Sequence, residues 1–234
     1  MQTNLGARSC QAFDISAGCS GFLYAADIAR QYVENGIVEH ALVAGVEVLS
    51  RFLNWEDRGT CVLFGDGCGA AVISRASNTD INRIIDSHME ADGTNADLLV
   101  QPAGGSRMPP TVETVREHKH TVHMEGNRIF KLAVKTMAHQ CDVVLQRNNW
   151  DIKSIDWLIS HQANMRIIEA LGKKLKIDTK KVIVNIEKYA NTSAASIPIA
   201  LDEAVRSGKI RRGDVVLLTA FGAGLTSGAL LMRY

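Results

Sequence analysis

The first part of the chain combines short apolar runs with one segment of helical periodicity. The periodic segment, residues 22–33, predicts a helix, and Gly36 shortly after it predicts the C-terminal cap of that helix. Residues 12–15 predict a short strand before it, and residues 41–46 are continuously apolar, as in a strand covered on both faces. The apolar positions recur at steps of four, three and four, the spacing of one helix face, and are Phe22, Ala26, Ala29 and Val33.

Two more apolar runs, residues 61–64 and 70–74, flank the glycine-rich turn Gly65-Asp66-Gly67. This arrangement predicts a pair of strands. Residues 101–125 are rich in proline and glycine, which indicates a loop or linker. They are the predicted boundary between a first half, residues 1–100, and a second half, residues 126–234.

The second half repeats the alternation of strands and helices. Helices are predicted over residues 126–148 and 165–175, and a third helix opens at Asn191. The alternation favours an α/β layered fold. The predicted strands of this half are residues 157–160, 182–186, 215–221 and 229–233, the last two around Gly222-Ala223-Gly224.

Two equally spaced segments indicate an internal duplication. Seventeen positions separate Cys19 from Gly36, and seventeen separate Asn191 from Gly208. Each segment reads as a small-residue turn, an amphipathic helix and a glycine stop, and a Phe-Gly-x-Gly turn follows each one later in the chain. A duplication would place a thiol and an amide at equivalent positions of two similar halves.

Composition indicates an ordinary soluble globular protein. The chain has 234 residues, 46% hydrophobic and 22% charged, with no apolar run of the roughly 20 residues that span a membrane. Its N-terminus lacks a signal-peptide pattern. Five cysteines without a CxxC pair favour a reduced, cytoplasmic location over a disulfide framework.

The net charge of +1 is unevenly distributed. Residues 128–212 carry 16 Lys and Arg against 8 Asp and Glu, so the rest of the chain is acidic. Such an asymmetry favours an acidic partner near the second half. Solvated helix faces explain the same charges equally well.

Cys19 is the first candidate for chemistry. It lies between a predicted strand and a predicted helix, where backbone N–H groups and the helix dipole favour the reactive thiolate. Its small neighbours leave room for a substrate. The alternative is a buried, inert cysteine, which is the common role of this residue.

His161 lies at the end of a predicted strand. This position is comparable to those of Cys19 and Asn191, which lie at the starts of predicted helices. A lone histidine is more often structural, but this placement favours a functional role. His118, His120 and His123 have a spacing that would suit a metal, but nothing completes a ligand set, and no metal is expected. The glycine turns resemble no phosphate-binding loop.

Four ordered motifs resemble the β-ketoacyl-acyl-carrier-protein synthase III family of the thiolase superfamily. They are residues 14–22 (Asp-Ile-Ser-Ala-Gly-Cys-Ser-Gly-Phe), residues 57–67 with Asp57-Arg58-Gly59-Thr60 and Phe64-Gly65-Asp66-Gly67, His161-Gln162-Ala163-Asn164, and residues 191–196 (Asn-Thr-Ser-Ala-Ala-Ser). The resemblance implies an α-β-α-β-α layered thiolase-like fold of two similar halves. The family has about ninety more residues before this point, so the first half is expected to be incomplete.

The resemblance also implies a two-step reaction. Cys19 would be acylated by an acyl-CoA, and malonyl-acyl-carrier protein would then lose carbon dioxide and condense with the acyl group. His161 and Asn191 would donate hydrogen bonds to the malonyl thioester oxygen. The backbone N–H groups of Cys19 and Ala223 would bind the oxyanion of acyl transfer. No cofactor is implied beyond the CoA thioester substrate.

Further residues match family positions outside the catalytic set. Arg58 matches a contact to the adenine end of CoA, and Asn164 would lie along the pantetheine arm. Met124 and Phe130 would line the acyl and pantetheine channel. The family implies a homodimer, and neither nucleic acid nor a membrane is an expected partner. The positions implied for docking of the acidic carrier protein are Lys131 and Arg166.

Two other functions remain open on the sequence. A thiolase-fold acyltransferase would move the acyl group from Cys19 to a non-malonyl acceptor, and product analysis with and without malonyl-carrier protein separates it from a condensing enzyme. A non-catalytic, truncated subunit would only bind a partner. Assay of the chain with and without an upstream region tests that case.

Overall fold

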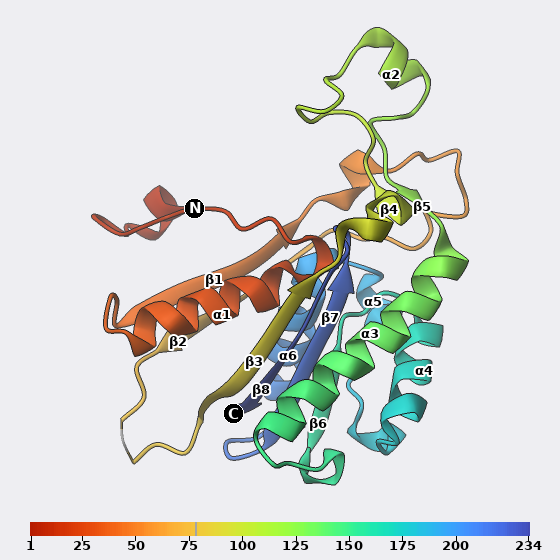
Figure 1. Ribbon diagram of the computed structural model, residues 1–234. Helices are drawn as coiled ribbons and strands as arrows, with labels where there is room; N and C mark the ends of the chain where they lie inside the picture. The colour runs from red at the N-terminus through yellow and green to blue at the C-terminus, as the bar shows by residue number, and fades with distance from the viewer. Residues whose placement is uncertain (78) are drawn as a thin grey trace.

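The computed structural model describes residues 1–77 and 79–234 (Figure 1), and the larger sheet of the described residues has four strands. Its order is β3-β8-β7-β6, with β6 and β7 parallel and the other pairs antiparallel. Every residue of β7 is buried, because helices cover both faces of this sheet. The bounds are β3 Arg83–Ala91, β6 Trp157–Ser160, β7 Val215–Gly222 and β8 Thr226–Arg233.

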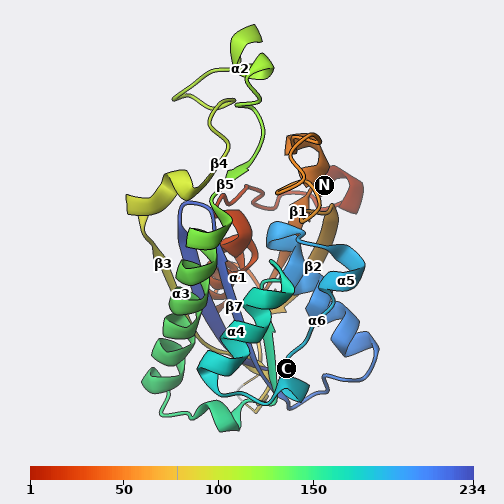
Figure 2. The same cartoon turned by 90° about the vertical axis from the view of Figure 1, so that its right-hand side faces the viewer.

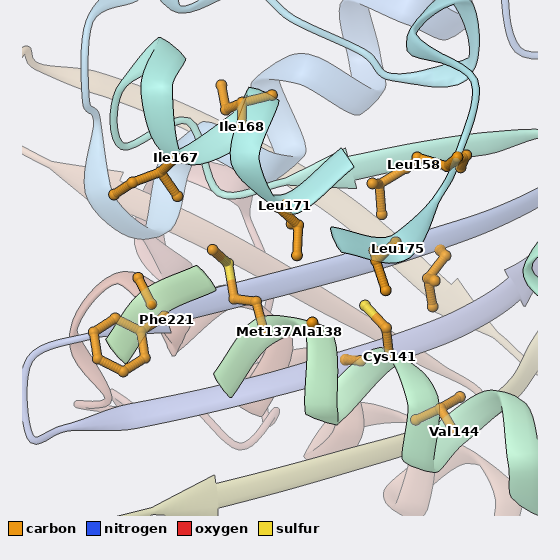
Figure 3. Close-up of a cluster of buried hydrophobic side chains, with 14 of the residues drawn as sticks. Met137, Ala138, Cys141, Val144, Leu158, Ile167, Ile168, Leu171, Leu175 and Phe221 are labelled. Carbon is orange, nitrogen blue, oxygen red and sulfur yellow. The ribbon is translucent and has the colours of Figure 1, made fainter. Parts of the chain in front are cut away.

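Alternate residues of β7 contribute to two separate cores. Leu217 and Phe221 pack on the side of α3 (Gly126–Arg147) and α4 (Met165–Leu175). Figure 3 shows Met137 and Cys141 of α3 facing Leu171 and Leu175 of α4 in this core. On the other side, residues 216, 218 and 220 pack toward α1 (Gly21–Glu34) and α6 (Ser196–Arg206).

A second, two-stranded sheet lies on the far side of α1 and α6 (Figure 2). It pairs β1 (His40–Glu47) with β2 (Gly67–Ser74) antiparallel. The described residues therefore form β-α-β-α layers, four of the five expected. The face of this sheet turned away from the helices is open, with Leu42 46%, Val46 56% and Val72 65% exposed. The expectation that residues 41–46 are covered on both faces is wrong for the described chain.

The segment between the halves projects from the rest of the molecule (Figure 1). It runs from β4 (Leu99–Val100) to β5 (His123–Met124) and carries the short helix α2 (Val112–Arg116), whose N-terminus Thr111 caps. Strand β3 precedes this segment but is hydrogen-bonded to β8, so the sheets do not divide at residues 101–125. The proposed domain boundary stays a prediction.

Helix periodicity predicts the long helices and their ends well. Helices α1, α3 and α4 lie where they are expected, and Gly36 and Gly208 both adopt the left-handed conformation, with φ of 69° and 71°. The helix expected from Asn191 begins later, at Ser196, after a 3₁₀ turn of residues Ser193–Ala195. Of the described helices, none combines the length and the apolar character needed to cross a bilayer.

Three predicted strands are wrong. Residues 12–15 have no regular structure, and Phe13 is 59% exposed, because no strand among residues 1–77 and 79–234 pairs with them. Residues 61–63 form turns after a bend in which Asp57 accepts hydrogen bonds from Gly59 and Thr60, and Phe64 makes only a single bridge, to Asn191. Residues 182–186 make a single bridge, at Val182, before the chain enters α5 (Ile186–Tyr189).

Candidate active site

Cys19 lies in a 3₁₀ turn of residues Gly18–Ser20 that leads directly into α1. Gly18 has a φ of +51°, a left-handed conformation that favours glycine. A Cβ atom on Gly222, at the end of β7, would lie 2.5 Å from the backbone nitrogen of Cys19. Two glycines thus let the end of the larger sheet approach the thiol turn closely.

The thiol of Cys19 is buried and protonated at neutral pH. Burial raises its pKa to about 11, while the Ser193 hydroxyl and the backbone N–H of Ala223 act in the opposite direction. The expectation that this position favours the thiolate is therefore wrong for the free protein, because desolvation of the charged sulfur outweighs the donors at the helix start. Those donors are nevertheless directed at the sulfur.

His161 follows β6 and is 2% exposed. Its backbone N–H donates to the carbonyl of Thr219 at 2.8 Å, which extends the pairing of β6 with β7 by one residue. Its Nδ1 lies 2.7 Å from the Oγ of Ser196. Burial lowers the pKa of His161 to about 4, so the imidazole is neutral at pH 7.

Asn191 is held by the first half of the chain. Its N–H donates to the Leu63 carbonyl at 2.9 Å, and its carbonyl accepts from the Gly65 N–H at 3.0 Å. Its side-chain Oδ1 accepts from the N–H of Ser193 at 2.9 Å. With Oδ1 engaged in this bond, the Nδ2 group, a donor only, is the part of the amide left for a ligand.

The three candidate residues are linked through the segment that follows Asn191. The turn that carries Cys19 contacts the turn at residues 193–195, where a Cβ atom on Gly21 would lie 3.4 Å from that of Ala194. Ser196, the next residue, links this segment to His161. The structure thus brings the turns of Cys19 and Asn191 together and connects His161 to the same segment through Ser196.

Comparisons with known proteins show which family the chain belongs to. Residues 13–93 match the family model described as 3-Oxoacyl-[acyl-carrier-protein (ACP)] synthase III, and residues 145–234 match the model of its C terminal region. The chain is 53% identical over 234 residues to a β-ketoacyl-[acyl-carrier-protein] synthase III of Caldanaerobacter subterraneus subsp. tengcongensis, covering 100% of this chain and 70% of that protein. The chain belongs to the 3-oxoacyl-[acyl-carrier-protein] synthase III family.

Solved structures support the fold. The 3-oxoacyl-[acyl-carrier-protein] synthase III of Aquifex aeolicus superposes with a TM-score of 0.89 at 46% identity, over 100% of this chain and 70% of that one. The Pseudomonas aeruginosa enzyme of the same description superposes with a TM-score of 0.92 at 34% identity, with the same coverage. The predicted thiolase-like α/β fold of this family is confirmed.

The other residues implied by the family resemblance lie in two places, on or near α3 and α4 and on the bend at residues 57–60. Phe130 of α3 packs under the guanidinium of Arg166, whose Cζ is 5.5 Å from the ring centroid, and Lys131 is exposed beside them. Met124 lies in β5 and packs against the same core as Phe130. Arg58 is exposed on the bend at residues 57–60.

Asn164 has a structural role in this fold besides any role toward substrate. Its Oδ1 accepts from the N–H of Ile167 at 2.9 Å and caps the N-terminus of α4. This interaction leaves the Nδ2 group as the part of the side chain available to a ligand.

The sequence alone assigns no role to three residues that lie next to the candidate residues. Ser193 and Ser196 belong to the quoted motif at residues 191–196, which is the signal that could have found them. Glu47 accepts from the N–H of Ala194 at 3.3 Å, and its charge adds to the raised pKa of Cys19. No local pattern predicts Glu47, because its position depends on the register of β1 against a distant turn.

Proposed function

We propose that the chain carries the active site of a decarboxylating condensation, in which an acyl-CoA primer and malonyl-acyl-carrier protein start fatty-acid synthesis. One observation supports this function above the others: the turn of a buried thiol packs against the turn that follows Asn191, and Ser196 of that segment is hydrogen-bonded to the buried, neutral His161. The first step needs the thiol. The second step needs donors that do not protonate a carbanion, and a neutral imidazole and an amide meet this requirement.

In the first step, the sulfur of Cys19 attacks the thioester carbon of acyl-CoA. A new C–S bond forms, the bond to CoA breaks, and the departing CoA sulfur takes up a proton in exchange for the one that Cys19 releases. The backbone N–H groups of Cys19 and Ala223 already face the sulfur, where they lower its pKa. We assign the same two groups to the oxyanion of the tetrahedral intermediate.

In the second step, malonyl-acyl-carrier protein loses carbon dioxide. The electron pair of the broken C–C bond passes into the thioester carbonyl, whose oxygen becomes negatively charged. His161 and Asn191 donate hydrogen bonds to this oxygen and favour the enolate. The resulting carbanion attacks the acyl carbon, a C–C bond forms, and Cys19 leaves as a thiolate that is then protonated.

The surroundings of the site suit these substrates. Lys131 and Arg166 are exposed cations on neighbouring helices and are proposed to dock the acidic carrier protein. Arg58 is assigned to the adenine end of CoA and Asn164 to the pantetheine arm. Met124 and Phe130 are assigned to the channel wall. We assign the protein to the cytoplasm as a homodimer that needs no cofactor or metal.

Radiolabelled acetyl-CoA tests the first step directly. The label is expected on the wild-type chain, in a peptide containing Cys19, and is expected to be absent from Cys19→Ala. Label that persists unchanged in Cys19→Ala would refute the assignment. A labelled wild-type chain that releases no carbon dioxide from malonyl-carrier protein would refute the condensation and leave an acyltransferase.

A further inference from the structure

Ser196 occupies an unusual position for a serine at a helix start. It is the first residue of α6 and is 3% exposed. Its Oγ lies 2.7 Å from His161 Nδ1, and the backbone N–H of Gln162 donates to it at 3.3 Å. Its hydroxyl is thus directed at the segment that carries the histidine rather than at its own helix.

The direction of the hydrogen bond between Ser196 and His161 follows from counting donors and acceptors. A serine hydroxyl has one hydrogen to donate and two lone pairs to accept with. The N–H of Gln162 uses one lone pair. Across the described chain, His161 Nδ1 is the one acceptor within hydrogen-bond distance of the hydroxyl. Donation in the opposite direction would leave the buried O–H without an acceptor, which is unfavourable.

We propose that Ser196 is a positioning residue that donates to Nδ1 of His161 and so holds the proton of the neutral imidazole on Nε2. The inference rests on the proposed function, because Nε2–H is then the group that donates to the malonyl thioester oxygen. The neutral state agrees with the burial of the ring, which lowers the pKa of His161 to about 4. An imidazolium would carry hydrogen on both nitrogens and leave Ser196 as an acceptor only.

The segment around His161 does not need the Ser196 hydroxyl to keep its backbone conformation. Gln162 donates from Nε2 to the carbonyl of Ser160 at 2.8 Å and accepts at Oε1 from the N–H of Asn185 at 3.1 Å. The N–H of His161 is bonded to Thr219. Ser196→Ala therefore removes the donor to the ring and the acceptor of the Gln162 N–H, while these three bonds remain.

The test is nitrogen NMR of the full chain labelled with ¹⁵N-histidine. Disappearance of one ring system in His161→Gln identifies the signals of His161. We expect a protonated Nε2 and an unprotonated, hydrogen-bonded Nδ1 in the wild type. In Ser196→Ala, the Nδ1 signal is expected to move toward that of a free nitrogen or to average with Nε2. Ser207→Ala, which removes another hydroxyl next to α6, should leave the spectrum unchanged.

Activity gives the second readout. Malonyl decarboxylation by Ser196→Ala is expected to fall about tenfold, and acylation of Cys19 to change less than about twofold, because only the second step uses Nε2–H. Ser196→Thr keeps the hydroxyl and is expected to restore the rate. A wild-type proton on Nδ1, or a spectrum of Ser196→Ala that matches the wild type, would overturn the inference. A correct tautomer in an inactive wild-type protein would instead overturn the proposed function.

Discussion

The turns that carry Cys19 and Asn191 are alike in sequence and different in structure. Each leads through a 3₁₀ turn into a helix that ends at a left-handed glycine. The Cys19 turn obtains its left-handed residue from Gly18, whereas the Asn191 turn places Ala190 and Ser193 at φ of 57° and 47°. The amide turn therefore holds strained non-glycine backbone, which persists only where its surroundings enforce it.

The two sheets supply those surroundings in a crossed arrangement. Gly222 of the larger sheet lies against Cys19 of the first half. The turn at Phe64 and Gly65, which comes from the first half, is hydrogen-bonded to Asn191 of the second. Each Phe-Gly-x-Gly turn thus supports the site residue of the other half. The contacts that support the two turns therefore cross from one half of the chain to the other.

The largest effect is expected from removal of the thiol. Cys19→Ala should lower acyl transfer from acyl-CoA by at least about 10⁴-fold, since no other group replaces the nucleophile. Single-turnover labelling with acetyl-CoA measures this. Cys141→Ala is the matched control, because burial raises the pKa of that thiol to about 12 and it packs in the α3–α4 core. Comparable loss in both variants would deny Cys19 its role.

The next effect separates the two turns. Asn191→Ala should lower malonyl decarboxylation by about 10²–10³-fold, the usual result of losing one donor to a developing oxyanion. Acylation of Cys19 should change far less, because the amide acts on the second substrate. Carbon dioxide release and acyl labelling measure the two steps separately. Equal losses in both steps would show that the turns do not divide the work.

The third prediction concerns the acidity of the Cys19 thiol, which has no counterpart in the Asn191 turn. With a pKa of about 11, the thiolate fraction should rise about tenfold per pH unit between pH 7 and pH 9. Alkylation of Cys19 by iodoacetamide, followed by mass spectrometry, should rise in parallel. Ser193→Ala should slow it at each pH, because the Ser193 hydroxyl lowers this pKa. A rate that levels off by pH 8 would contradict the burial effect.

The smallest effects concern the two supporting glycines. A methyl group on Gly222 would press on Cys19, and one on Gly65 would press on the carbonyl of Tyr189, beside Asn191. Each Gly→Ala change should lower the free energy of unfolding by about 1–3 kcal/mol. Per folded molecule, Gly222→Ala should lower acylation and Gly65→Ala decarboxylation, each by about tenfold.

Denaturant unfolding and the two rate assays check this prediction. Gly93→Ala is the control, because nothing lies within 4 Å of the added Cβ. If either supporting variant slows both steps equally, the crossed support of the two turns is wrong.

Elements with their own periodicity are the part of the fold that could be predicted. The faces of α1, α3 and α4 repeat along the chain, and β7 and β8 join through a short glycine turn. The predicted strand at residues 12–15 is wrong because a strand needs a hydrogen-bonded neighbour, which a local pattern does not reveal. The one at residues 61–64 is wrong because Asp57 stabilises turns there instead.

The candidate site also has a part that could be predicted from the sequence and a part that could not. The motifs around Cys19, His161 and Asn191 could be found from residue type and order. The influence of Ser196 and Glu47 could not, because it depends on which atoms face the ring and the thiol after folding. The acidity of Cys19 was predicted with the wrong sign, since burial is a property of the whole tertiary structure.

The family, the helices α1, α3 and α4, and the three candidate residues with their order in the chain could all be predicted from the sequence. Residue type and local spacing are sufficient for these. The tertiary structure alone decided which sheet supports which turn, how strongly burial shifts the pKa of Cys19 and His161, and which way the Ser196 hydroxyl points. These properties arise from contacts between residues far apart in the chain, where desolvation and hydrogen bonding act together.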